Sequence, residues 1–139
     1  MAFIEWNISY SVGVKMIDSQ HQKLFSLINN FYDATKGINR ENLAPIDSAL
    51  QDLFSYVDFH FKTEEKYFEE FSYEKTQEHK KQHKFYEDKI KDLNEKYQKE
   101  KKDEEISEEI ISFIKDWILN HIKISDKEYG KCFNEHGLV

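Results

Sequence analysis

Histidine and carboxylate side chains recur in this sequence at the spacing of metal ligands on helices. His60 and Glu64 are four residues apart, and so are His79 and His83. Side chains four apart on a helix project from the same face, one turn above each other. Each pair can therefore reach one common point. Imidazole together with carboxylate binds iron, zinc, copper or nickel, so the chemistry that these pairs indicate is metal binding.

Three further candidate ligands lie on other apolar segments. His21 stands alone near the start, and Asp126 follows His121 by five residues. Five residues at about 100° each would place Asp126 about 140° around an ideal α-helix from His121. Spacing alone therefore leaves open whether Asp126 is a ligand. The sixth histidine, His136, lies off any apolar stripe and is expected to be exposed.

Apolar residues recur every three or four positions along most of the chain, which is typical of amphipathic helices. This periodicity predicts four helices, at about 18–36, 42–71, 76–100 and 107–129. An arm at 1–17 precedes them, and Ser107 is expected to cap the fourth helix. Glycine (4) and proline (1) are scarce, which favours long helices with short links. We predict an all-α fold, an up-down-up-down antiparallel four-helix bundle with an N-terminal arm, as one domain over residues 1–139.

The five histidines of these helices interrupt the apolar stripes, so the bundle would bring seven polar groups into its core: His21, His60, Glu64, His79, His83, His121 and Asp126. A single buried histidine is more often a satisfied core residue than a ligand. Seven convergent groups are different, because burying each without a partner costs roughly 2–7 kcal/mol. A metal would satisfy them together. The single cysteine, Cys132, allows neither a cysteine zinc site nor an internal disulfide, and it is expected to be an ordinary thiol.

Seven ligands exceed the needs of one ion, so two ions are implied. On two six-coordinate ions, five histidines, two bridging carboxylates and a bridging oxide or hydroxide leave one position open. A metal with an open position can bind a small external ligand. Phe61, Trp117 and Ile118 lie near the ligands in sequence and would line that position with apolar groups, which suits dioxygen.

Composition excludes several other classes of function. The net charge of −7 disfavours nucleic acids and acidic membranes as partners. No stretch approaches the roughly 20 apolar residues of a membrane span, and residues 1–20 do not resemble a signal peptide. We therefore expect a cytoplasmic protein.

Several longer motifs carry a resemblance to a known family. They are the segments at 11–14, 18–21, 60–65, 78–83 and 117–126. Together they resemble the hemerythrin family in its single-domain bacterial form, over nearly the whole chain. The resemblance implies reversible dioxygen binding at two non-haem iron ions (Fe²⁺/Fe³⁺) with a bridging oxo or hydroxo group.

The resemblance also implies a role for each ligand. His79, His83 and His121 would hold the first iron, which the protein saturates. His21 and His60 would hold the second iron, which keeps the open position.

The same resemblance assigns the carboxylates. Glu64 and Asp126 would bridge the two irons, which favours Asp126 as a ligand where spacing left the question open. Ile118 would line the dioxygen pocket at a place where the family more often has leucine.

We expect oxygen storage, transport or delivery rather than enzymatic turnover, with dioxygen and an oxygen acceptor protein as partners. One alternative is an oxygen or redox sensor that acts on a separate protein. Another is a diiron enzyme that handles peroxide or nitric oxide.

Overall fold

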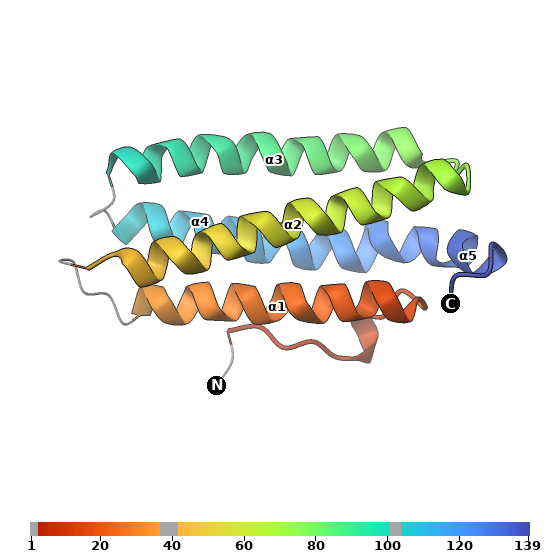
Figure 1. The fold of residues 1–139 in the computed structure, drawn as a ribbon, viewed down its shortest axis with the longest axis horizontal. Coiled ribbons are helices and arrows are strands. Elements are labelled where there is room, and N and C mark those ends of the chain that lie inside the picture. The colour runs from red at the N-terminus through yellow and green to blue at the C-terminus, as the bar shows by residue number, and fades with distance from the viewer. Residues whose placement is uncertain (1–2, 37–41, 101–103) are drawn as a thin grey trace.

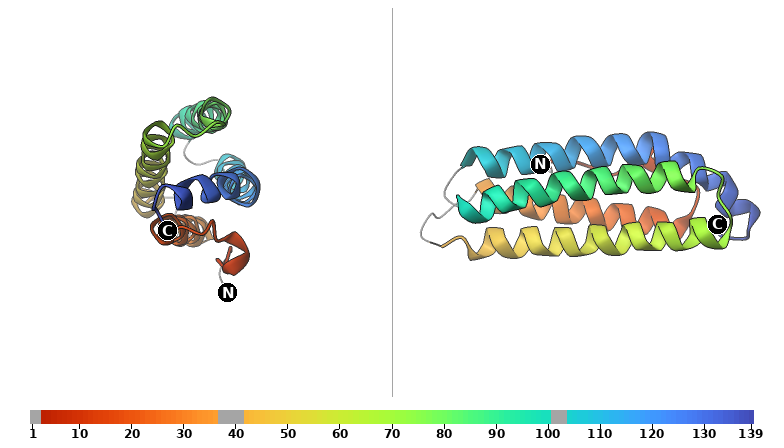
Figure 2. Two further views of the ribbon diagram at one scale, coloured as in Figure 1. Left: turned by 90° about the vertical axis from the view of Figure 1, so that its right-hand side faces the viewer. Right: turned by 90° about the horizontal axis from the view of Figure 1, so that it is seen from above.

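The computed structural model describes residues 3–36, 42–100 and 104–139. Within these ranges four long helices follow one another: α1 (Lys15–Lys36), α2 (Ala44–Glu70), α3 (Thr76–Lys99) and α4 (Glu104–His121). Figures 1 and 2 show that they lie side by side and alternate in direction, so the predicted all-α, up-down-up-down bundle is confirmed. Among the described helices, none combines the length and the hydropathy that crossing a membrane requires.

The arm is held against the start of α1, which begins three residues before the predicted residue 18. The Asp18 carboxylate accepts hydrogen bonds from the Val12 backbone N–H (2.9 Å) and the Ser11 hydroxyl (2.5 Å). Asp18 lies inside the first turn of α1, and from there its side chain fastens the preceding arm. The arm itself contains a short 3₁₀ helix, η1 (Ile8–Tyr10). Residues 1–2 of the predicted arm lie outside the described residues.

The fourth helix differs most from its predicted range of 107–129. It begins at Glu104, and the Ser107 hydroxyl donates to the Glu104 carbonyl (3.0 Å), so Ser107 lies within the first turn and is not the cap. After His121 the backbone forms a π-helix, η2 (Ile122–Asp126), and then α5 (Lys127–Glu135). The predicted bounds of α2 and α3 differ from the observed ones by no more than two residues at either end, which is ordinary for helix termini.

Two apolar clusters pack the bundle, and the candidate ligands lie between them along the helices. The larger cluster includes Leu24 and Phe61, and the smaller one at the end of the bundle includes Ile17 and Phe68. On α1, for example, His21 stands between Ile17 and Leu24. A band of polar side chains is thus enclosed by hydrophobic packing on both sides, which keeps water out.

Gly130 lets α5 close the end of the bundle against the arm. A Cβ atom at this position would stand 2.2 Å from the Val12 carbonyl oxygen, which is backbone and cannot rotate away. We expect Gly130→Ala to lower the free energy of unfolding by about 1–3 kcal/mol, the usual cost of overpacking. Lys131→Ala is the control, because Lys131 is exposed on the same helix. Urea unfolding measures both, and equal midpoints for the two variants would contradict this close contact.

Candidate metal centre

All seven candidate ligands are buried in the middle of the bundle, with exposed fractions between 0% and 6%. They come from every long helix and from the π-helix. α1 contributes His21, α2 contributes His60 and Glu64, α3 contributes His79 and His83, α4 contributes His121 and η2 contributes Asp126. The structure therefore brings together every residue that the sequence predicted for this site.

The ligand atoms form two groups, each with all its atoms within 4.8 Å of one another. One group is Glu64, His79, His83 and His121, and the other is His21, His60, Glu64 and Asp126. The Nε2 atoms of His79 and His121 are 2.9 Å apart, and those of His21 and His60 are 3.1 Å apart. Two nitrogens at right angles on one metal ion, each about 2.1 Å from it, are about 3.0 Å apart. Each pair thus has the spacing of neighbouring ligands on one ion.

Glu64 belongs to both groups. Its Oε1 atom lies 3.2 Å from Nε2 of His60 and 3.4 Å from Nε2 of His83. Its Oε2 atom lies 4.0 Å from Nε2 of His79. One carboxylate therefore faces histidines of both groups, as a bridge between two ions requires.

Asp126 also faces both groups. Its Oδ2 atom lies 3.0 Å from Nε2 of His21, while its Oδ1 atom lies 3.1 Å from Nε2 of His79 and of His121. The π-helix explains how it gets there. Because its hydrogen bonds run from i to i+5 rather than i to i+4, a residue five positions after His121 returns to the same side of the helix.

The hydrogen-bonding state of these atoms tests whether a cation fits. Both carboxylate oxygens of Glu64 and of Asp126 are buried without a hydrogen-bond partner, and so is Nε2 of His83. Histidine nitrogens stand 3.0–4.0 Å from these oxygens, yet none meets hydrogen-bond geometry. Unpaired buried acceptors are costly, and positive ions between them would satisfy all of them at once. The residues present therefore fit two metal ions.

Two residues that sequence reasoning missed orient the histidine rings. The Nδ1 atom of His60 donates to Oε1 of Gln20 (2.6 Å), and Nδ1 of His83 donates to Oε2 of Glu65 (2.8 Å). A proton held on Nδ1 leaves the Nε2 lone pair free for a metal. The sequence offered one sign of these two roles, which is that each residue is next to a predicted ligand. Gln20 precedes His21, and Glu65 follows Glu64.

Burial and neighbouring charges shift the pKa values of His60 and His83 in opposite directions. Burial lowers the pKa of His60 to about 4, against the attraction of Glu64. Burial also acts to lower the pKa of His83, but its contacts with Glu64 and Glu65 outweigh it and raise that pKa to about 9. The His60 ring is therefore neutral at pH 7, and a metal ion bound to His83 would take the place of a proton.

The three residues predicted to line the dioxygen pocket lie around the histidines in different ways. Phe61 stacks on His83, with ring centroids 3.8 Å apart and planes 4° apart, and Trp117 stacks on His121 at 4.3 Å and 15°. Ile118 is 2% exposed within the larger cluster. Phe61 and Trp117 border two different cavities, so their shared role at one vacancy stays a prediction.

Comparison with known proteins places this arrangement in a family. The model of the hemerythrin HHE cation binding domain matches residues 12–133. The chain belongs to the hemerythrin family. A bacteriohemerythrin from Methylococcus capsulatus is 30% identical, over 96% of this chain and 99% of that protein. A hemerythrin-like protein from Naegleria gruberi is 38% identical, over 89% of this chain and 88% of that protein.

Solved hemerythrin structures share the fold as well. A crystal structure of wild-type hemerythrin superposes with a TM-score of 0.81 at 29% identity, and covers 94% of this chain and 98% of that one. A crystal structure of a hemerythrin mutant, in which a leucine is replaced by alanine, gives a TM-score of 0.82 at the same identity. The hemerythrin fold thus extends across both apolar clusters and the ligand band between them.

Outside this centre, His136 and Cys132 form a separate surface contact. His136 is exposed and stacks on Phe71, with centroids 4.6 Å apart. Its Nδ1 atom is 3.9 Å from the Cys132 sulfur. His136 therefore takes no part in the ligand band, as predicted.

The hydrogen bond from His60 to Gln20 yields a testable prediction. We expect Gln20→Leu to weaken metal binding by roughly 10–100-fold, the usual effect of removing a group that orients a ligand. Competition with a chelator measures this. Gln20→Glu should restore binding, because its carboxylate also accepts from Nδ1. Gln22→Leu is the control, since Gln22 is exposed on the same helix. If Gln20→Leu and Gln22→Leu bind metal equally well, the orienting role of Gln20 is wrong.

Proposed function

We propose that this protein binds dioxygen reversibly at a pair of non-haem iron ions, for oxygen storage, transport or delivery. The observation that carries the proposal is the unequal division of histidines around two shared carboxylates. Three histidines (His79, His83 and His121) adjoin Glu64 in one group, and only two (His21 and His60) adjoin it in the other.

This inequality defines where an external ligand would enter. If Glu64, Asp126 and an oxo or hydroxo group served as bridges, His79, His83 and His121 would complete six positions on the first iron. His21 and His60 would leave one position open on the second. Two ferrous ions with an open position supply the electrons that reversible dioxygen binding uses.

The chain's own residues perform three tasks in this proposal. Glu64 and Asp126 would hold the two ions together, since each carboxylate faces histidines of both groups. Gln20 fixes the ring of His60, on the side with the open position. Phe61 and Ile118, which are 1% and 2% exposed, exclude water from the ligand band. A dry surrounding hinders the escape of charged, oxidised oxygen species.

Binding rather than turnover is the favoured activity, because the seven proposed ligands would be engaged in holding the ions. Glu65, the nearest further carboxylate, accepts from His83. Turnover of peroxide or nitric oxide with a reductant would instead support the enzymatic alternative.

The decisive experiment is optical. The protein is loaded with ferrous iron under argon, its iron content is measured, and air is admitted. Two irons per chain and a visible charge-transfer band that bleaches on argon flushing are expected. Immediate and irreversible oxidation would overturn the carrier function.

A further inference from the structure

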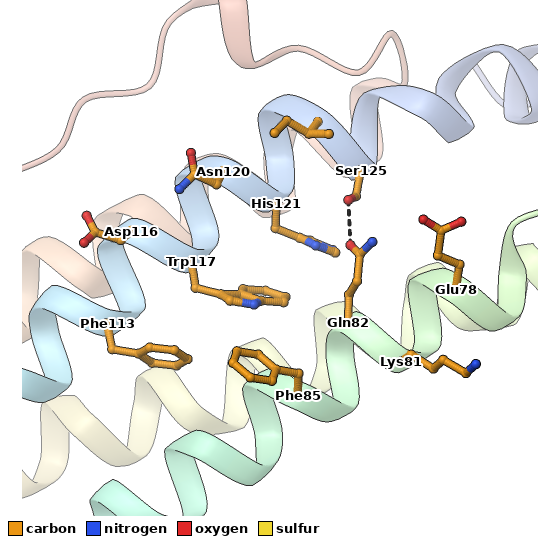
Figure 3. Close-up of a pocket in the computed structure, with 11 residues that line it drawn as sticks. Glu78, Lys81, Gln82, Phe85, Phe113, Asp116, Trp117, Asn120, His121 and Ser125 are labelled. Carbon is orange, nitrogen blue, oxygen red and sulfur yellow. Dashed lines mark hydrogen bonds between the residues drawn. The ribbon is translucent and has the colours of Figure 1, made fainter.

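A cavity of about 660 Å³ lies between α3 and α4, beside the metal centre. Figure 3 shows the rings of Phe85, Phe113 and Trp117 gathered at one end of it, with Gln82 and His121 toward the other. Sites for small molecules usually measure roughly 300–1,000 Å³ and combine apolar walls with a few polar groups. This cavity has both properties.

Some of the apolar side chains that line the cavity are also exposed at the protein surface. Phe85 is 60% exposed and Ile124 is 63% exposed, and both line it. Large apolar residues grouped at the surface often mark a binding site. The aromatic walls favour a flat aromatic molecule, because stacked rings gain more than their buried area alone provides.

The cavity also leads to the metal centre through one pair of rings. Trp117 lines the cavity and stacks on His121, with ring centroids 4.3 Å apart. Of the seven proposed ligands, His121 alone lines this cavity, and at 6% it is the most exposed of them. A molecule that contacts Trp117 in the cavity is therefore separated from the proposed metal ligand His121 by the Trp117 ring alone.

A diiron carrier of this kind needs such an entry for electrons. Once both ions have been oxidised to the ferric state, two electrons must return before dioxygen can bind again. The ligands are nearly fully buried, so a reductant cannot reach the ions directly. Electrons must pass through side chains that connect the surface with a ligand.

We propose that this cavity binds a planar heteroaromatic reductant of the dihydroflavin class, and that Trp117 and His121 carry its electrons to the metal centre. This inference rests on the proposed diiron function. The dihydroflavin loses two electrons and two protons and becomes a flavin. Each of the two ferric ions takes one electron and becomes ferrous, and both protons leave to solvent at the open side of the cavity.

Charge selects among molecules of this class. Glu78 and Asp116 line the cavity with two negative charges, against the single positive charge of Lys81. An uncharged flavin such as riboflavin is therefore favoured over the phosphorylated flavin mononucleotide, whose phosphate would be repelled.

Binding is tested with riboflavin on the diferric protein, followed by the fluorescence of the flavin. We expect saturable binding that Phe85→Ser weakens about tenfold or more, because an aromatic wall of the site is lost. Phe59→Ser is the matched control, since Phe59 is 54% exposed on α2 and is not among the residues that line the cavity. Flavin mononucleotide should bind more weakly than riboflavin.

Reduction is tested with dihydroriboflavin under argon by stopped-flow absorbance. The rate should saturate with concentration in the natural protein and in Phe59→Ser, and at concentrations below saturation it should be about tenfold or more lower in Phe85→Ser because the site binds less reductant. Reduction by dithionite, which needs no aromatic site, should be equal in all three. Absence of saturable riboflavin binding, or equal behaviour of the two variants, would overturn the inference. The proposed dioxygen function is tested separately, by the iron content of the protein and by the reversible visible band.

Discussion

His60→Ala is expected to lower the iron content from two ions per chain to one and to abolish the reversible visible band. His60 is one of only two histidines in its ligand group, and its Nε2 atom is 3.1 Å from that of His21. Without it, one histidine and two carboxylates remain for the ion that is proposed to keep the open position. The three histidines of the other group are untouched, so the first ion should stay bound. Iron analysis and the optical spectrum measure both effects.

The bundle itself should survive this change, because the packing of amphipathic helices supplies most of the stability of such a fold. Circular dichroism provides that check. His136→Ala is the matched control, since His136 is exposed and stacks on Phe71 outside the centre. Two irons and normal oxygen binding in His60→Ala would show that the proposed ligand assignment is wrong.

Removal of the proposed iron ions should lower the thermal unfolding midpoint by more than about 10 °C. An ion present at 1,000 times its Kd stabilises a folded protein by about 4 kcal/mol, and about 1 kcal/mol shifts the midpoint of a small domain by several degrees. The structure gives a reason to expect tight binding. The four oxygens of Glu64 and Asp126 are buried with no hydrogen-bond partner, so removal of the ions would leave them unsatisfied.

A scanning calorimeter compares the iron-loaded and chelator-treated protein. Ferrous iron should restore the midpoint, whereas magnesium should not, because magnesium prefers oxygen ligands and the centre is rich in imidazole. Equal midpoints with and without iron would mean that the seven side chains are stable without an ion.

Much of the site was predictable because its residues break a regular pattern. His60 and Glu64 occupy positions on α2 where the helical period calls for apolar side chains, and both are buried. A polar residue at a core position needs a partner, so the pattern itself indicated metal. The same periodicity located α2 and α3 almost to the residue.

Other features could not be predicted because periodicity carries no information about them. Gln20 and Glu65 resemble ordinary polar residues of helix surfaces, and only the fold brings them to His60 and His83. Serine is a residue type that commonly caps helices, yet α4 begins at Glu104, three residues before Ser107.

The π-helix after His121 has a consequence at the far end of the chain. If the same five residues formed ordinary α-helix with none deleted, Asp126 and all that follows would be turned by about 100°. Gly130 would then rotate away from Val12, and the rings of Tyr129 and Phe133 would swing out of the smaller cluster. The π-turn thus takes up one surplus residue and keeps the rotational phase of the C-terminal segment, and a substitution that restored α-helical hydrogen bonds without removing a residue would open the end of the bundle.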